Sequence, residues 1–332
     1  MNSSLATLIF LICAAATSLK AQTPPLAEQQ PQDEDVQRIS TSMVAVPVIV
    51  KTREGAYIPN LRREDFRIYE DGIQQEISSF DTIDAPFTVI LMLDLSDSTR
   101  IKLVEIQNAA LAFLNQLRPD DRALIVSFDK QFRVLTKITG DRKLLAEAIK
   151  QVQTGGGTAI YDAFDTAITA HLKQVPGRKA VVVLTDGVDT SSVRATYEST
   201  LRLATEQYAL IYPIQYDTPN DVKAKQPDDQ YGLVTYTTPS GEPLNKAYER
   251  GTRYLRSIAE ISGGRFQYSD SVKNLENSFA RIAEELRQQY SLSYYPKNLN
   301  SKSGKRRLTI VVSVPNAIVH ARDNYVYKPD SR

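Results

Sequence analysis

Hydroxyl and carboxylate side chains follow predicted buried strands or open a predicted helix at three places in the chain. Residues 94–98 (DLSDS) follow one apolar run, residues 155–158 (GGGT) open a predicted helix, and residues 185–187 (TDG) follow another apolar run. Ligands of open parallel sheets bind outside the carboxyl ends of the strands, so polar side chains gathered there need explaining. These segments are therefore the first candidates for a binding site.

Composition excludes most other chemistry. The single cysteine, Cys13, lies in an N-terminal apolar run, and the two histidines, His171 and His320, are far apart in the sequence. Disulfides, thiolate sites and cysteine nucleophiles are therefore not expected, nor is a histidine zinc site or a Ser-His-Asp relay. The 40 Lys and Arg residues balance the 39 Asp and Glu residues, which excludes a global basic field for nucleic acid. Any chemistry must come from oxygen.

The N-terminal segment is typical of an export signal. Residues 5–16 form an apolar stretch that is followed by polar residues and the small Ala21. We expect a signal peptide over residues 1–21 with cleavage near Ala21, and a secreted, periplasmic or cell-surface protein; an uncleaved anchor is the alternative. Residues 22–41 are rich in Gln, Pro, Asp and Glu and predict a flexible polar leader. No later apolar run approaches the ~20 residues of a membrane span.

Residues 85–290 alternate between predicted strands and predicted helices. Apolar runs at 88–93, 123–128 and 180–185 predict buried parallel strands, and the segments between them show helical spacing. This alternation predicts an α/β fold: a doubly wound, mostly parallel sheet with helices on both faces.

Strand patterns flank this region on both sides. Residues 42–84 contain an edge strand with Pro47 and a hairpin turned at Asp71, and residues 291–329 return to alternating strands. Neither piece has enough strands to form a stable sheet alone. We therefore predict that the two pieces pair as a small β-sandwich-like module, with the α/β domain inserted between them.

Taken together, the three oxygen-rich segments resemble the metal-ion-dependent adhesion site of the von Willebrand factor A domain. That site has a DxSxS loop, a distant Thr after glycines, and an Asp in a T/SDG turn, and the likeness covers about residues 86–289. The resemblance implies a metal held by Asp94, Ser96, Ser98, Thr158 and Asp186. The segments LRREDF (61–66), YEDG (69–72) and YYP (294–296) are also similar to the exported bacterial VWFA-related family often labelled acidobacterial.

This set of side chains suits a hard divalent cation. Mg²⁺ prefers six oxygens in a near-octahedral array and keeps some of its water, which hydroxyls and carboxylates allow; Mn²⁺ and Ca²⁺ are alternatives. With only about two full negative charges around it, the metal can accept a carboxylate from a protein partner. We therefore predict an exported Mg²⁺-dependent protein-binding module of adhesion type, and not an enzyme.

Each segment also has a simpler structural interpretation. Ser98 and Asp97 could cap the next helix, the glycines of 155–157 could form a flexible turn, and Asp186 could belong to an ordinary turn. Asp189 is assigned to the loop and not to the metal ligands. The conjunction of suitable residue types in the right order favours the metal site over these separate readings.

Two other functions compete with adhesion. One is a structural envelope scaffold in which the metal only clamps the three loops. The other is a metal-dependent hydrolase or phosphotransfer enzyme. The enzyme is less favoured because the sequence has no nucleophile and base pair and no GxxxxGK[ST] phosphate loop.

Residues 217–251 form a segment rich in Pro, Tyr, Asp and Lys, where a strand and a helix need only a short connection. Loops of this length are usually functional or disordered. The segment leaves the same sheet edge as the candidate metal loops. It predicts either ligand contacts through Tyr231, Tyr236 and Tyr248 or an insert that makes no contacts.

Overall fold

The computed structural model describes residues 43–96, 99, 102–206, 209–216, 237–298 and 304–327, all within one compact unit. The expected signal peptide and leader lie outside the described residues, as do Ser98, Asp97, Tyr231 and Tyr236. Within the described part of the chain, no helix is both long and apolar enough to cross a membrane.

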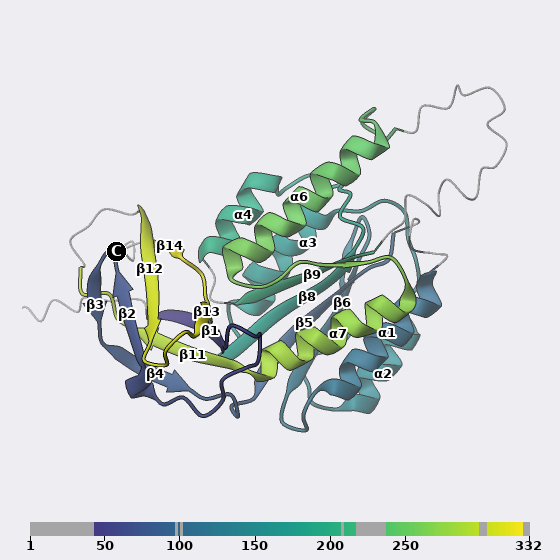
Figure 1. Cartoon of the computed structure of the whole chain (residues 1–332). Coiled ribbons are helices and arrows are strands. Elements are labelled where there is room, and N and C mark those ends of the chain that lie inside the picture. The colour runs from purple at the N-terminus through teal and green to yellow at the C-terminus, as the bar shows by residue number, and fades with distance from the viewer. Residues whose placement is uncertain are drawn as a thin grey trace, which may run out of the picture. The chain divides into compact units, whose positions relative to one another are not determined.

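A six-stranded sheet in the order β10-β9-β8-β5-β6-β7 forms the centre of the α/β domain (Figure 1). Its strands are β5 (Phe87–Asp94), β6 (Arg122–Phe128), β7 (Phe132–Val134), β8 (Arg178–Thr185), β9 (Leu210–Tyr216) and β10 (Gln267–Ser269). Only β7 pairs antiparallel in this sheet, at one edge. The predicted mostly parallel α/β fold is therefore confirmed.

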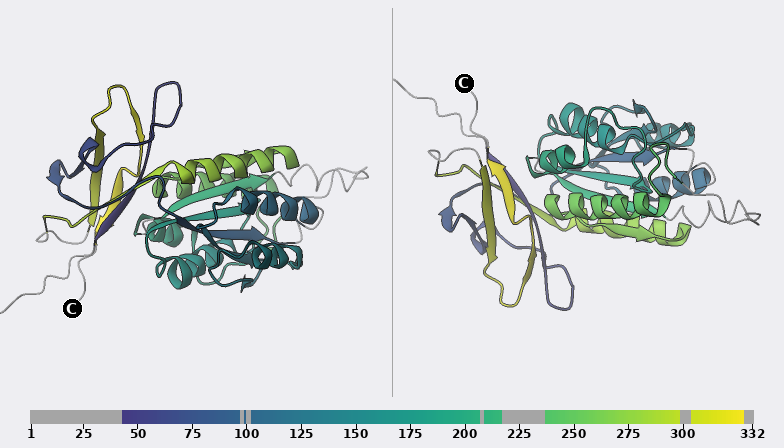
Figure 2. Two further views of the ribbon diagram at one scale, coloured as in Figure 1. Left: turned by 90° about the horizontal axis from the view of Figure 1, so that it is seen from below. Right: turned by 90° about the horizontal axis from the view of Figure 1, so that it is seen from above.

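Helices cover both faces of this sheet, as Figure 2 shows. One face packs against α1 (Leu103–Gln116), α2 (Arg142–Lys150) and α7 (Val272–Arg287). The other packs against α3 (Ile160–Thr166), its π-helical continuation (Ala167–Leu172), α4 (Tyr197–Glu206) and α6 (Leu244–Ser262). Successive residues of β5 point to opposite faces, so Leu91 enters the first core and Met92 the second. Both faces of β5 are buried, which explains why most of its side chains are apolar.

The structure corrects the predicted start of α6. The sequence places residues 244–251 in a long insert, yet they form the first turns of this helix. Ala247, Gly251 and Leu255 recur at helical spacing and are buried, so packing on the sheet orders the segment. Tyr248 consequently lies on a helix and not in an irregular loop.

Strands from before and after the α/β domain pair in two further sheets, of order β13-β1-β11-β4 and β14-β12-β2-β3. The first sheet contains β1 (Val44–Lys51), β4 (Ile77–Asp81), β11 (Gln289–Tyr294) and β13 (Ile318–His320). The second contains β2 (Phe66–Glu70), β3 (Ile73–Gln75), β12 (Gly304–Val312) and β14 (Asn324–Tyr327), and a short 3-10 helix (Arg63–Asp65) precedes β2. Side chains of both sheets share one apolar core, which gives a sandwich-like β module.

A buried ion pair joins the two halves of this β module. Glu70 of β2 is 2% exposed and pairs with the guanidinium of Arg306 on β12. It also accepts hydrogen bonds from the hydroxyls of Tyr294, at 2.6 Å, and Tyr325, at 2.8 Å. A buried charge is tolerated only when it is paired and hydrogen-bonded. These contacts therefore bind the N-terminal hairpin to the C-terminal strands.

Arg178 joins the α/β domain to the connections that enter and leave it. This buried first residue of β8 donates to the carbonyls of Ile83, at 3.2 Å, and Ala85, which lie between β4 and β5. It also donates to the carbonyl of Leu286 near the end of α7. Both connections therefore meet at the amino ends of the central strands, at the edge opposite Asp94.

Removing the Glu70 carboxylate should destabilise the β module strongly. Glu70→Ala leaves Arg306 buried without its counter-ion, which costs about 3 to 5 kcal/mol of unfolding free energy. Urea denaturation followed by circular dichroism measures this loss. The matched control, Glu64→Ala, removes an exposed carboxylate from the same segment and should cost less than about 0.5 kcal/mol. Equal midpoints for the two variants would contradict the role given to Glu70.

Charged groups also gather where β1 and β13 meet the α/β domain. Glu285 of α7 pairs with Arg265 at 3.1 Å and accepts from the Tyr212 hydroxyl at 3.2 Å. His320 lies opposite Ile49 in the β1 and β13 pairing, close to this cluster. Burial, and then the charges of Arg265 and Lys51, lower the pKa of His320 below its ordinary value of 6.5.

Stability should therefore fall on the acid side of neutrality. Because its pKa is lower in the folded protein, His320 binds a proton more readily in the unfolded chain, so stability decreases as pH falls through about 6.5. His320→Gln should flatten this dependence in urea titrations between about pH 7 and pH 5. The matched control is His171→Gln, which removes the other histidine, whose ring stacks on Phe132. A wild-type slope in His320→Gln would contradict the prediction.

Candidate functional site

Parallel pairing of β5 with β8 brings two of the oxygen-rich segments together. The register places Leu93 opposite Leu184, so Asp94 ends its strand next to Thr185. The Thr185 hydroxyl donates to Asp94 Oδ2 at 2.6 Å. The glycine segment joins them because the Gly155 amide donates to the Leu95 carbonyl at 2.7 Å. Segments far apart in sequence therefore meet at one sheet edge.

The carboxylates at this edge are buried and act on each other. Asp94 is 0% exposed and Asp186 is 2% exposed. Burial, followed by the charge of Asp186, raises the pKa of Asp94 to about 8. The Thr185 hydroxyl and the Ser96 amide, 3.1 Å from Asp94 Oδ1, oppose this shift by donating hydrogen bonds. The two buried carboxylates therefore do not both carry a full negative charge near neutral pH without a counter-ion, and a cation at this edge would favour their ionised forms.

The predicted ligand residues that can be placed lie at this edge. Ser96 lies two residues after Asp94, Thr158 lies just before α3, and both are buried. Ser98 lies outside the described residues. Among the residues that the structure describes, no group of three or more His, Cys, Asp or Glu could hold a metal. A cation at this edge would therefore depend on hydroxyl oxygens as well as carboxylates, a donor set that fits a hard ion such as Mg²⁺.

The backbone of Thr158 is fixed by the loop that follows β8. Its amide donates to Thr190 Oγ1 at 2.9 Å, and its carbonyl accepts from the Thr190 and Ser191 amides at 2.8 and 2.9 Å. Gly157 has a φ of +71°, and a Cβ there would lie 2.6 Å from Ser191 Oγ. A Cβ on Gly155 would lie 1.8 Å from Asp129 Oδ2. The glycines are therefore needed for the close approach of these loops.

The Asp186 turn contacts β9 and α6, and the sequence pattern did not predict these two contacts. Gln215 Nε2 donates to the Asp186 carbonyl at 2.8 Å, and the Val188 amide donates to Asp186 Oδ1 at 3.0 Å. A Cβ on Gly251 of α6 would lie 2.4 Å from the Gly187 carbonyl oxygen. A glycine inside an amphipathic helix is the sequence signal that could have indicated this contact.

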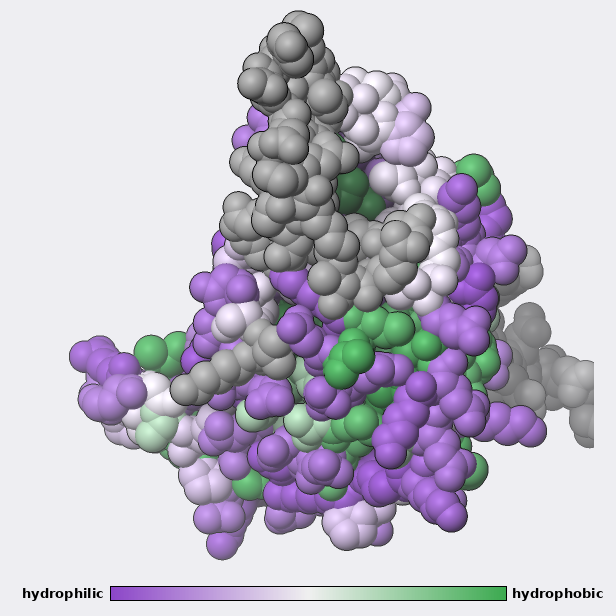
Figure 3. Space-filling model, turned by 90° about the vertical axis from the view of Figure 1, so that its right-hand side faces the viewer, coloured by the Kyte–Doolittle hydropathy of each residue, from purple (hydrophilic) through white to green (hydrophobic). Residues whose placement is uncertain are grey.

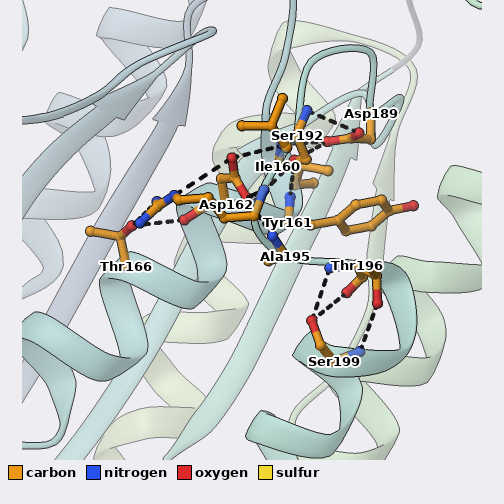
Figure 4. Close-up of polar contacts among 11 residues, drawn as sticks. Ile160, Tyr161, Asp162, Thr166, Asp189, Ser192, Ala195, Thr196 and Ser199 are labelled. Carbon is orange, nitrogen blue, oxygen red and sulfur yellow. Dashed lines mark hydrogen bonds and ion pairs between the residues drawn. The ribbon is translucent and has the colours of Figure 1, made fainter.

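Asp189 lies in the loop network next to this site. Its Oδ1 accepts from the Ile160 amide at 2.9 Å and the Ser192 hydroxyl at 2.5 Å (Figure 4). Asp162 accepts from the amides of Val193, at 3.0 Å, and Ala195, at 2.7 Å. These carboxylates satisfy backbone donors, and they hold the loop between β8 and α4 against the start of α3.

Exposed apolar and basic side chains surround the carboxyl edge of the sheet. Val193 after β8 is 87% exposed, and Val104 at the start of α1 is 65% exposed. The exposed Lys130, after β6, lies against the glycine segment, since a Cβ on Gly157 would be 2.8 Å from its Cε. The space-filling view of this side shows hydrophobic surface among polar groups (Figure 3).

Two curated relatives share part of this sequence. A UPF0353 protein of Mycolicibacterium vanbaalenii is 25% identical over 217 residues, which is 60% of this chain and 60% of that protein. The chain thus spans about 60% of that relative's length. An uncharacterised protein of Synechocystis is 30% identical over 106 residues, covering 31% of this chain and 25% of that protein.

Solved structures with similar folds have low sequence identity. A von Willebrand factor type A protein from Catenulispora acidiphila is 12% identical, covers 80% of this chain and 74% of its own, and has a TM-score of 0.49. An aerotolerance-related membrane protein from Bacteroides fragilis is 17% identical, with coverages of 61% and 99% and a TM-score of 0.44.

A match to a protein-family model covers the segment that carries the candidate site. The matching family is the von Willebrand factor type A domain, and the match spans residues 89–189. This range begins in β5, includes Asp94, Thr158 and Asp186, and ends in the loop after β8. Through these residues, the chain contains a von Willebrand factor type A domain.

Proposed function

We propose that this protein is an exported, metal-dependent protein-binding module of adhesion type. In this proposal Mg²⁺, or Mn²⁺ or Ca²⁺, is held by the residues at the carboxyl edge and takes an acidic group of a protein partner. The residues assigned to the cation are Asp94, Ser96, Ser98, Thr158 and Asp186. Von Willebrand factor type A domains are generally interaction modules, which supports a binding role and not an enzymatic one.

The observation that carries the proposal is the buried pair of carboxylates, Asp94 and Asp186. Asp94 has the Asp186 charge as its principal electrostatic neighbour, and its other main contacts are the Thr185 and Ser96 hydrogen-bond donors. Burying like charges together is unfavourable unless a cation compensates them. A divalent ion would compensate the charges of the two carboxylates, and its remaining positive charge would attract an acidic group of a partner.

The chain's own residues would divide the work of binding. The two carboxylates provide the charge that retains the cation, while Ser96 and Thr158 contribute neutral oxygens. Because neutral oxygens add no negative charge, the site keeps its attraction for an incoming carboxylate.

The surroundings of the site support an acidic partner with an apolar neighbour. Lys130 adds a positive charge next to the Thr158 segment, and Val193 and Val104 offer exposed apolar contacts. Interfaces combine such apolar contacts with charge complementarity, which guides association. We place this interaction outside the cytoplasm because the apolar residues 5–16 are typical of an export signal.

Mg²⁺ should stabilise the wild-type protein but not Asp94→Asn. A ligand that binds only the folded state at 100 times its Kd adds about 2.7 kcal/mol of stability. Asp94→Asn keeps the shape of the side chain but removes its negative charge and one of its two acceptor oxygens. The site is therefore tested by the shift that Mg²⁺ adds to each variant over its own stability in EDTA. Thermal unfolding with Mg²⁺ and with EDTA measures this shift, and Asp189→Asn should keep the Mg²⁺ response. Equal Mg²⁺ stabilisation of Asp94→Asn would reject the site.

Partner capture should require the same cation. Immobilised wild-type protein should retain an extracellular protein in Mg²⁺, release it in EDTA, and fail to retain it when Asp94→Asn is used. Mass spectrometry of the eluates makes the comparison. Capture that persists in EDTA and in Asp94→Asn would instead favour the structural scaffold, in which the metal does not contact the partner.

A further inference from the structure

A buried tyrosine hydroxyl at the carboxyl edge has no acceptor for its proton. Tyr216 is the last residue of β9 and is 4% exposed. Among the described residues the proton of its hydroxyl has no acceptor, although the backbone of Asp186 lies close enough to the hydroxyl oxygen to act against the rise in its pKa. A buried donor without a partner is costly, and such groups in folded proteins are uncommon. The proton of this hydroxyl is therefore available to an acceptor at the carboxyl edge.

Strand pairing places Tyr216 beside the candidate cation site. Thr185 of β8 is opposite Gln215 of β9, so the next residue, Tyr216, continues along the Asp186 turn. Gln215 and Tyr216 point to opposite faces of the sheet. The amide of Gln215 holds the Asp186 carbonyl at 2.8 Å, whereas the ring of Tyr216 enters the core beneath α1 and α7.

The surroundings of the hydroxyl make it a hydrogen-bond donor. Burial, and then the charges of Asp94 and Asp186, raise the pKa of Tyr216 well above its ordinary value. A phenol keeps its proton near neutral pH at its ordinary pKa of about 10, and Asp94 and Asp186 are its charged neighbours. A phenol that donates to a charged oxygen makes a stronger hydrogen bond than one between neutral groups.

Tyr216 also lines a cavity between α1, β9 and the start of α7. The cavity has a volume of about 240 Å³, and its lining includes Ser269 and Leu275. The side chain thus faces space as well as packed atoms.

We infer that Tyr216 is a positioning residue of the cation site, whose hydroxyl would donate to a carboxylate oxygen of Asp94 or Asp186 in the cation-bound protein. The inference rests on the proposed function, because the hydroxyl has this role only if the edge holds a cation. Groups that hydrogen-bond to metal ligands orient them, and losing such a group typically weakens metal affinity by about 10- to 100-fold.

A second tyrosine on the same strand provides the matched control. Tyr212 is also buried, but its hydroxyl has a partner, Glu285 Oε1, at 3.2 Å. Tyr212 lies four positions before Tyr216 and away from the carboxyl edge. Tyr212→Phe removes a hydroxyl that donates to Glu285. Tyr216→Phe removes a hydroxyl of the same strand whose proton has no acceptor.

The test combines calorimetric titration of the full chain with Mg²⁺ alone and thermal unfolding in EDTA. Tyr216→Phe should weaken Mg²⁺ binding by about tenfold or more. Its unfolding temperature in EDTA should be unchanged or higher, because in the metal-free protein the hydroxyl donates to no acceptor. Tyr212→Phe should show the opposite pattern: a lower unfolding temperature and wild-type Mg²⁺ affinity.

Three results would overturn the inference, and they are distinguishable. Wild-type Mg²⁺ affinity in Tyr216→Phe would reject the positioning role while leaving the cation site intact. A fall in the metal-free unfolding temperature of Tyr216→Phe as large as that of Tyr212→Phe would show that the hydroxyl has a structural partner. Absence of Mg²⁺ and Mn²⁺ binding by the wild type would reject the proposed function and this role together.

Discussion

The hydrogen bond from Thr185 to Asp94 is the contact on which the arrangement of the carboxyl edge depends. It is 2.6 Å long and joins the ends of two parallel strands whose residues are 91 positions apart. Parallel strands end at the same edge, so their pairing aligns side chains that the chain separates by a crossover. Asp94 can remain buried because Thr185 and the Ser96 amide satisfy its oxygens. The Asp186 turn and the glycine segment then pack against this fixed point.

Strand pairing and packing also explain how a stable fold can keep Asp94 and Asp186 buried close to each other. The β5 strand is buried on both faces and paired on both sides, so hydrophobic packing holds Asp94 in place. A carboxylate so placed cannot move toward water to reduce repulsion with Asp186. Rigid positioning of this kind would suit the proposed cation, because the assigned residues would need little rearrangement to bind it.

The β module is connected to the α/β domain at the amino edge of the central sheet. Arg178 shows that both connections to the module lie at the amino ends of the central strands. The module is itself held together by Glu70 and Arg306, which come from opposite ends of the sequence. The arrangement separates two tasks: the amino edge joins the two parts of the protein, and the carboxyl edge presents polar loops and exposed apolar side chains.

Local sequence pattern by itself determined the sheet class and where its polar loops lie. The apolar run of β5 predicts a strand buried on both faces, and the placement of Asp94 and Asp186 after such runs predicts that they meet. The pairing of the flanking strand segments was also predictable, because neither can form a sheet alone. The assignment of these loops to a cation, including Ser98, remains a prediction.

Only the tertiary structure decided how the edge is supported. Glycine and tyrosine at positions 251 and 216 look ordinary in the sequence, yet one allows α6 to contact the Gly187 carbonyl and the other places a hydroxyl near two carboxylates. The sequence pattern also did not predict that α6 starts at Leu244. Nor did it predict that Glu70 pairs with Arg306, 236 residues away. Periodicity reports which face of an element is buried, whereas the atoms that meet it come from distant segments and are set by packing.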